Sequence, residues 1–88
     1  MNFLHYEIEA HENEAIEVSL TSAANVQLMD SENFALYQSG RPFHYFGGYA
    51  KTSPFLLKAP RSGRWHIVVD LGGYAGQVRA SVKVLETA

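Results

Sequence analysis

The chain has 88 residues, which allows one domain, 1–88, and excludes a second. Apolar residues make up 47% of it and charged residues 18%, which excludes a disordered protein, and the absence of cysteine excludes disulfides and thiolate chemistry. A formal net charge of −2 argues against a surface built to bind nucleic acid.

Alternation of apolar and polar residues with a period of two dominates the first third of the chain. Leu4, Tyr6 and Ile8 alternate with polar residues, so the first strand begins almost at once. The same pattern predicts half-buried antiparallel strands at 15–21 and 26–29.

One short helical turn is predicted near residues 31–39. Asp30 or Ser31 can act as the N-cap, Phe34 and Tyr37 fall on one face, and Gly40 stands where a glycine commonly follows a helix end. We expect this turn to plug one end of the sheets.

A bent or bulged strand is predicted around Tyr45 and Tyr49, which flank a Gly-Gly pair. More continuously apolar strands, expected to be central, follow at 55–59 and 65–71, and an alternating one at 77–85. The inward positions expected in the two apolar strands are Phe55, Leu57, Trp65, Ile67, Val69 and Leu71. About seven strands at regular spacing predict an all-β fold, a small antiparallel β-sandwich that is jelly-roll-like or a flattened barrel.

Charge is divided unevenly along the chain. The first 40 residues carry seven acidic and no basic side chains, and the remainder carries seven basic and two acidic ones. Opposite charges on neighbouring strands would help to set the register, as in pairs of Glu7 or Glu17 with Arg79 or Lys83. The alternative is a basic face for an anionic partner.

The tetrapeptide Gly-Gly-Tyr-Ala occurs twice, at 47–50 and 72–75. Paired glycines allow positive φ angles, so each copy is interpreted as an aromatic-bearing corner. These corners either close the ends of the core or form a binding surface. The residues of that candidate binding surface are Tyr45, Gly47, Gly48, Tyr49, Lys51, Gly72, Gly73 and Tyr74.

Three segments resemble a small bacterial family, domain of unknown function 1883. They are the run from Trp65 to Gly76 continued by 78–82, the segment 45–54, and the opening 3–7. The resemblance covers nearly the whole chain and implies an all-β, sandwich-like fold. It carries over no catalytic residue. Members joined to a Toll/interleukin-receptor-like signalling domain imply a sensing or docking role.

A looser likeness is to pre-peptidase C-terminal and similar jelly-roll modules. It is carried by 25–30, by Asn33-Phe34, and by 62–69 with its Gly-x-Trp. It implies a non-catalytic accessory module.

The sequence contains no motif typical of an enzyme active site, and no catalytic residue is expected. His66 and Asp70 lie four residues apart on one predicted strand, or about 13 Å at 3.3 Å per residue, which is too far for a dyad. His66 could instead pair with a residue of a neighbouring strand. No Gly-x-Ser-x-Gly occurs, which argues against a serine nucleophile.

No metal site and no cofactor are expected from spacing along the chain. The four histidines, at positions 5, 11, 44 and 66, form neither His-x-His nor His-Glu-x-x-His, and no acidic loop has the EF-hand pattern. Convergence of ligands from different strands stays open. The glycines match neither phosphate-binding loop, which excludes those nucleotide sites.

The leading functional hypothesis is a non-enzymatic module that binds a protein or self-associates. A carbohydrate or other polar-ligand platform is the alternative, because exposed tyrosines serve both uses. The aromatic and basic segment 41–51 leaves single-stranded nucleic acid as a lesser alternative. The first ten residues show no export or membrane segment, so a soluble cytoplasmic protein is expected.

Overall fold

The computed structural model describes residues 3–72 and 76–85, which form seven β-strands and one α-helix. Most element ends lie within two residues of the predicted ones, and the last strand begins three residues later than expected, at Ala80. In chain order the elements are β1 (Leu4–Ala10), β2 (Ala15–Leu20), β3 (Ala24–Met29), α1 (Ser31–Gln38), β4 (Phe46–Ala50), β5 (Phe55–Lys58), β6 (Gly63–Asp70) and β7 (Ala80–Leu85).

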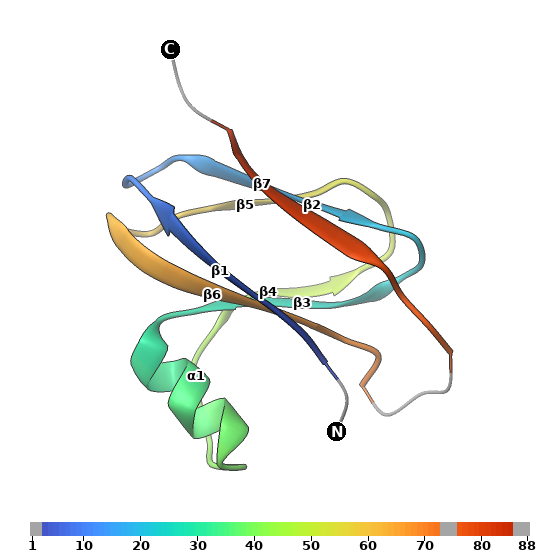
Figure 1. The fold of residues 1–88 in the computed structure, drawn as a ribbon, viewed down its shortest axis with the longest axis horizontal. Coiled ribbons are helices and arrows are strands. Elements are labelled where there is room, and N and C mark those ends of the chain that lie inside the picture. Colours follow the sequence, from blue (N-terminus) through green and yellow to red (C-terminus); the bar gives the residue numbers. More distant parts are fainter. Residues whose placement is uncertain (1–2, 73–75, 86–88) are drawn as a thin grey trace.

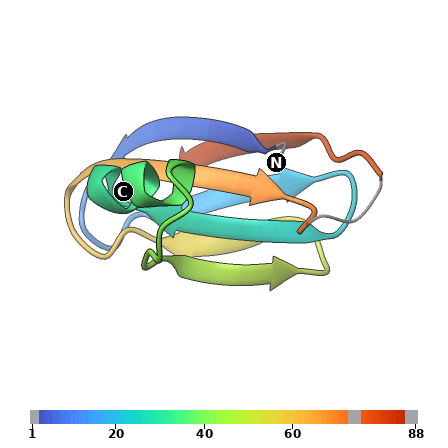
Figure 2. The same cartoon turned by 90° about the horizontal axis from the view of Figure 1, so that it is seen from below.

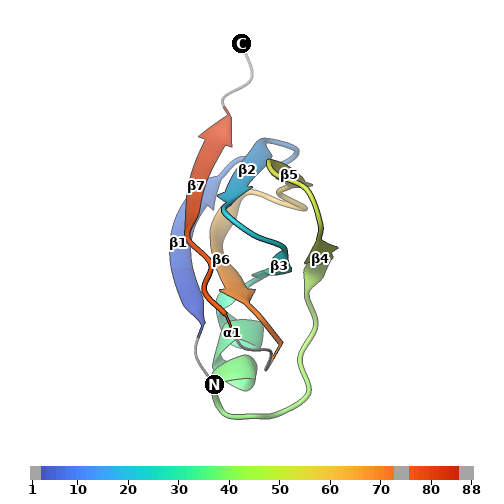
Figure 3. The ribbon, with the colours of Figure 1, turned by 90° about the vertical axis from the view of Figure 1, so that its right-hand side faces the viewer.

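The strands form two antiparallel sheets packed face to face (Figure 1). One sheet has four strands in the order β1-β6-β3-β4, and the other has three in the order β5-β2-β7. Figure 3 shows the two sheets as separate layers. No ladder within residues 3–72 and 76–85 joins the layers, so the predicted β-sandwich is confirmed and the flattened barrel is wrong.

The core lies between the sheets because alternate residues of each strand point inward. In the four-stranded sheet, Leu4, Val69 and Val26 stand opposite one another across three adjacent strands. Trp65, Ile67 and Val69 are buried, as predicted, and the other three expected positions are partly buried against them. The buried core consists of Ala10, Ile16, Val18, Ala24, Val26, Leu28, Ala50, Ala59, Trp65, Ile67 and Val69.

Of the two acidic residues predicted to pair with Arg79 or Lys83 across neighbouring strands, one does so. Glu17 on β2 stands directly opposite Lys83 on β7, where an opposite-charge pair contributes about 0.2 to 1 kcal/mol. Glu7 stands opposite His66 on β6, so its predicted pairing with Arg79 or Lys83 is wrong.

The helix begins and ends with the predicted capping residues. The Asp30 carboxylate accepts from the Asn33 N–H at 2.9 Å, and that hydrogen bond holds the pKa of Asp30 below its ordinary value. Gly40 follows the helix with a φ of 74°, a left-handed conformation that glycine adopts without strain.

The position of α1 differs from the prediction. It packs Phe34 against Met29 and Val68, which point away from the three-stranded sheet. The helix therefore lies across the outer face of β6 and β3, as Figure 2 shows, and does not plug an end of the sandwich. Tyr37, three residues after Phe34, packs beside it because the two residues share one helix face.

Two predictions about strand position are wrong. The strand Phe55–Lys58 is an edge of the three-stranded sheet, whereas β6 is central as expected. The first Gly-Gly-Tyr-Ala copy is not a corner, because 47–50 lie within β4 at the edge of the other sheet. The β3–β4 register runs without a skipped residue, so there is no bulge, although Gly47 has a φ of 119°.

Gly47→Ala should destabilise the fold by about 1 to 3 kcal/mol, because a Cβ there would overlap the Val26 carbonyl oxygen and the φ is unfavourable for alanine. Gly48→Ala is the matched control, since no atom lies within 4 Å of its Cβ position. Its free energy of unfolding in urea should stay within about 0.5 kcal/mol of the parent. Equal losses in both variants would contradict this account of Gly47.

Candidate functional site

The outer face of the four-stranded sheet carries two of the three buried polar side chains among the described residues, His66 and Asp70. We use this name for the strand positions that point away from the three-stranded sheet, with α1 lying across them (Figure 2). The outer-face positions are His5, Glu7, Glu9, Asn25, Gln27, Met29, Gly47, Tyr49, Arg64, His66, Val68 and Asp70.

Two histidines meet on this face. His5 lies on β1 and His66 on β6, and their atoms Nε2 and Nδ1 lie 2.8 Å apart, so that one donates to the other. The two rings meet edge to edge through these nitrogens and are nearly parallel, with an interplanar angle of 9°. The register explains the meeting: His66 stands opposite Glu7, and His5 is the next outward residue along β1.

The helix covers this histidine pair. The Phe34 ring stacks on His5 at 4.0 Å and on His66 at 4.7 Å between centroids, and the Ser31 Oγ lies 2.8 Å from the His66 Nε2. His66 is only 5% exposed. Burial, followed by the neighbouring His5, lowers the pKa of His66 below its ordinary value, so the neutral imidazole is favoured.

Glu7 borders the histidine pair on its exposed side. Its Oε1 lies 4.0 Å from the His66 Nδ1, and its Oε2 lies 3.8 Å from Arg64. The nearest ligand atoms of Glu7 and the two histidines all lie within 4.8 Å of one another. This arrangement can share a proton or hold a metal ion.

A second polar cluster surrounds Asp70 at the other end of β6. Its Oδ1 accepts from the Asn25 side chain and from the Gly72 N–H, both at 2.9 Å, and its Oδ2 accepts from the Tyr37 hydroxyl at 3.2 Å. These bonds satisfy a carboxylate that is only 6% exposed. Burial and then the Asp70 charge raise the pKa of Tyr37 to about 12.

His66 and Asp70 do not form a catalytic dyad, in agreement with the strand-spacing argument. His66 bonds to His5 and Ser31, whereas Asp70 bonds to Asn25, Tyr37 and Gly72. His66 instead pairs with a residue of a neighbouring strand, the possibility that the sequence left open.

Described parts of the two Gly-Gly-Tyr-Ala copies lie at the same end of the four-stranded sheet. Tyr49 stands opposite Asn25, and a Cβ at Gly72 would lie 2.9 Å from the Asn25 side-chain nitrogen. Asn25 therefore connects the two copies. Gly73 and Tyr74, also predicted as site residues, lie outside the described residues.

The remaining predicted site residues lie on β4 or directly next to its ends. Tyr45 and Tyr49 are 46% and 60% exposed, Gly47 and Gly48 lie between them, and the exposed Lys51 follows the strand. Phe46 is 52% exposed although it contacts the Trp65 ring edge to face. The structure thus gathers exposed aromatic side chains along one sheet edge.

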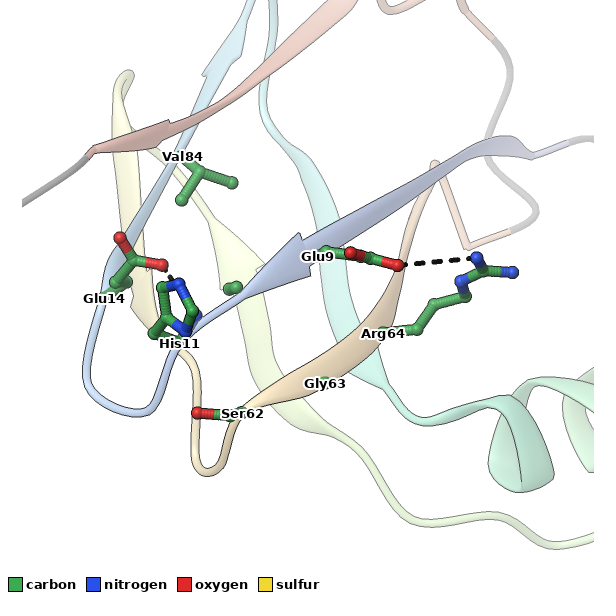
Figure 4. Close-up of a pocket in the computed structure, with 8 residues that line it drawn as sticks. Glu9, His11, Glu14, Ser62, Gly63, Arg64 and Val84 are labelled. Atoms are coloured by element: carbon green, nitrogen blue, oxygen red, sulfur yellow. Dashed lines mark hydrogen bonds and ion pairs between the residues drawn. The ribbon is translucent and has the colours of Figure 1, made fainter.

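A depression of about 660 Å³ lies beside the β1–β2 turn, at the end of the sandwich away from Asn25 and Gly72 (Figure 4). Several of its polar groups are already used locally: the Glu14 carboxylate accepts from the His11 N–H at 2.6 Å, and Arg64 lies 3.6 Å from Glu9. Ser62 accepts from the Glu12 N–H. The contacts of Glu14 and Ser62 hold turns in place, and the Arg64–Glu9 contact joins β6 to β1.

The convergence of His5, Glu7 and His66 was not predicted from the sequence. Metal-ligand motifs are recognised by spacing along the chain, and the two histidines are 61 residues apart. The available signal was alternation, because all three residues occupy polar positions facing away from the inward Leu4, Tyr6 and Trp65. Convergence of potential ligands from different strands, which the sequence left open, occurs for these three residues.

Comparison with known proteins identifies a family for this chain but indicates no activity. A family model described as "Domain of unknown function (DUF1883)" matches residues 1–88. No curated protein and no solved structure matches the chain. Among the described residues, no helix has the length and apolar character needed to span a membrane.

Tyr37→Phe should alter the stability of the fold at alkaline pH. The pKa of Tyr37 is higher in the folded chain than its ordinary value of 10.0, so the unfolded chain loses this proton first. The contribution of the neutral Tyr37 to the unfolding free energy is therefore lost as pH rises from about 10 through about 12. The parent should therefore lose more unfolding free energy than Tyr37→Phe between pH 9 and 12, as urea titrations can measure. Parallel pH profiles would contradict the assignment.

Proposed function

We propose that this chain, which belongs to the DUF1883 family, is a non-enzymatic β-sandwich module that self-associates through its edge strand β4. The observation that carries the proposal is the character of that edge. Between 46 and 50, β4 has no charged residue, yet it presents Phe46 and Tyr49 to solvent.

The other sheet edges carry features that oppose pairing with a second chain. Exposed charges lie on β1 as Glu7 and Glu9, on β5 as Lys58, and on β7 as Lys83. Charged residues on edge strands are a common protection against edge-to-edge association. Since β4 lacks this protection, it is the edge best suited to pair with another strand.

The sequence of β4 also fits pairing with its own copy. In an antiparallel register centred on Gly48, Tyr49 of each copy would stand opposite Gly47 of the other. An aromatic ring facing a glycine across two strands covers the space that the missing side chain leaves. Tyrosine adds a large contact area at a small cost in conformational entropy.

A sensing or docking role fits a module whose contact surface is a sheet edge, because β-strand addition is a common way to recognise another chain. The cytoplasmic location expected from the sequence remains part of this proposal.

Tyr49→Lys should abolish self-association while preserving the fold. The substitution removes the ring that would face Gly47 of the other copy and places a charge on the edge strand, which opposes edge-to-edge pairing, so the dimer dissociation constant should rise at least about tenfold. Sedimentation equilibrium measures that constant, and circular dichroism and urea unfolding report the fold. Leu56→Lys is the matched control, because Leu56 is 58% exposed but lies on β5.

A parent protein that stays monomeric at high micromolar concentration would overturn self-association. Retention on a glycan matrix that Tyr49→Lys abolishes, with monomeric mass in both proteins, would support the carbohydrate alternative instead. Loss of the dimer in both lysine variants would place the contact elsewhere than β4.

A further inference from the structure

Three potential metal ligands converge on the outer face at the β1 edge. His5 and Glu7 come from successive outward positions of β1, and His66 comes from the position of β6 directly opposite Glu7. One nitrogen of each histidine and one carboxylate oxygen lie within 4.8 Å of one another. Because two paired strands supply all three residues, their backbone spacing is set by the β1–β6 ladder.

The two imidazoles already direct nitrogen atoms at each other. The His5 Nε2 and His66 Nδ1 are 2.8 Å apart, so the bridging proton lies where two nitrogen lone pairs would otherwise meet. Two nitrogens bound to a tetrahedral zinc ion at 2.0–2.1 Å are about 3.3 Å apart. An ion replacing that proton requires the two nitrogens to move apart by about 0.5 Å and the rings to turn so that both lone pairs point at the ion.

Glu7 supplies the third ligand and the negative charge. Its Oε1 is 4.0 Å from the His66 Nδ1, while its other oxygen faces Arg64 at 3.8 Å. The side chain is half exposed, at 50%, so it can rotate toward an ion without disturbing the core. The exposed side also provides an entry path from solvent.

Groups outside the triad hold the ligands in orientation. A His66 tautomer that donates from Nε2 to the Ser31 Oγ at 2.8 Å leaves its Nδ1 lone pair toward His5 and Glu7. Metal-binding histidines in proteins use their second nitrogen in this way. Phe34 stacks on both rings and limits their rotation.

From this geometry we infer that His5, Glu7 and His66 form a binding site for a divalent first-row transition-metal cation, with zinc as the best fit. Imidazole nitrogens favour such ions, whereas magnesium and calcium prefer sites made of oxygen ligands. Three protein ligands leave a fourth tetrahedral position for water. The bound ion would tie the edge strand β1 to the buried strand β6.

The site is independent of the proposed self-association. It lies at the β1 edge, and β4 is the opposite edge of the same sheet. Either proposal can fail without the other.

Calorimetric titration with Zn²⁺ of the full chain, after dialysis against a chelator, tests the site directly. The parent should bind one ion per chain, and Co²⁺ in its place should give the intense visible absorption of a tetrahedral centre. His5→Gln and Glu7→Gln should each weaken binding, His5→Gln by more than about 100-fold. Ser31→Ala removes an outer partner and should weaken binding by about 10- to 100-fold.

Glu9→Gln and His11→Gln are the matched controls. Glu9 is the next outward residue of β1, and His11 follows the same strand outside the triad. Both should retain the parent affinity, and circular dichroism should show that all variants fold. Unchanged affinity in folded His5→Gln and Glu7→Gln would overturn the inference, as would no binding by the parent or a loss of binding in His11→Gln alone.

Discussion

Burial of β6 on both faces is the constraint on which the outer face of this sandwich depends. The inner side of β6 packs in the core, and its outer side lies beneath α1, so every residue from Trp65 to Asp70 is buried. Two of those residues, His66 and Asp70, are polar, and a buried polar group without a partner costs free energy. Their partners therefore come from every element around them: His5 from β1, Asn25 from β3, and Ser31 and Tyr37 from α1. Ser31 is the first residue of the helix, so the N-terminal end of α1 lies over His66.

The edges of the four-stranded sheet differ in chemistry, and that difference separates the two proposed activities. At the β1 edge, acidic side chains and a histidine stand beside the buried strand, which suits a cation and opposes pairing with another chain. At the β4 edge, glycine and exposed aromatic residues leave backbone groups accessible, which suits strand addition. The central strands connect the two edges, and Asn25 and Asp70 link the end of β4 to the segment after β6.

Much of the fold could be predicted because it depends on local pattern. Period-two alternation identified the strands, Asp30 and Gly40 marked the helix ends, and the continuous apolar run from Trp65 identified β6 as central. The same run of apolar residues misplaced Phe55–Lys58, because a short edge strand with an exposed Leu56 has the composition of a central one. The Gly-Gly pair at 47–48 indicated a corner, yet the ladder with β3 keeps it extended.

What the sequence by itself determined was the all-β class, the inward residues of β6, the helix and its caps, and the aromatic character of the segment 45–49. Only the tertiary structure decided that α1 covers a sheet face, that β4 is an edge, and that His5 and Glu7 meet His66. The physical reason is that alternation assigns a side chain to a face but not to a neighbour. Neighbours follow from strand order and register, which are set by contacts between residues as far apart in the chain as His5 and His66.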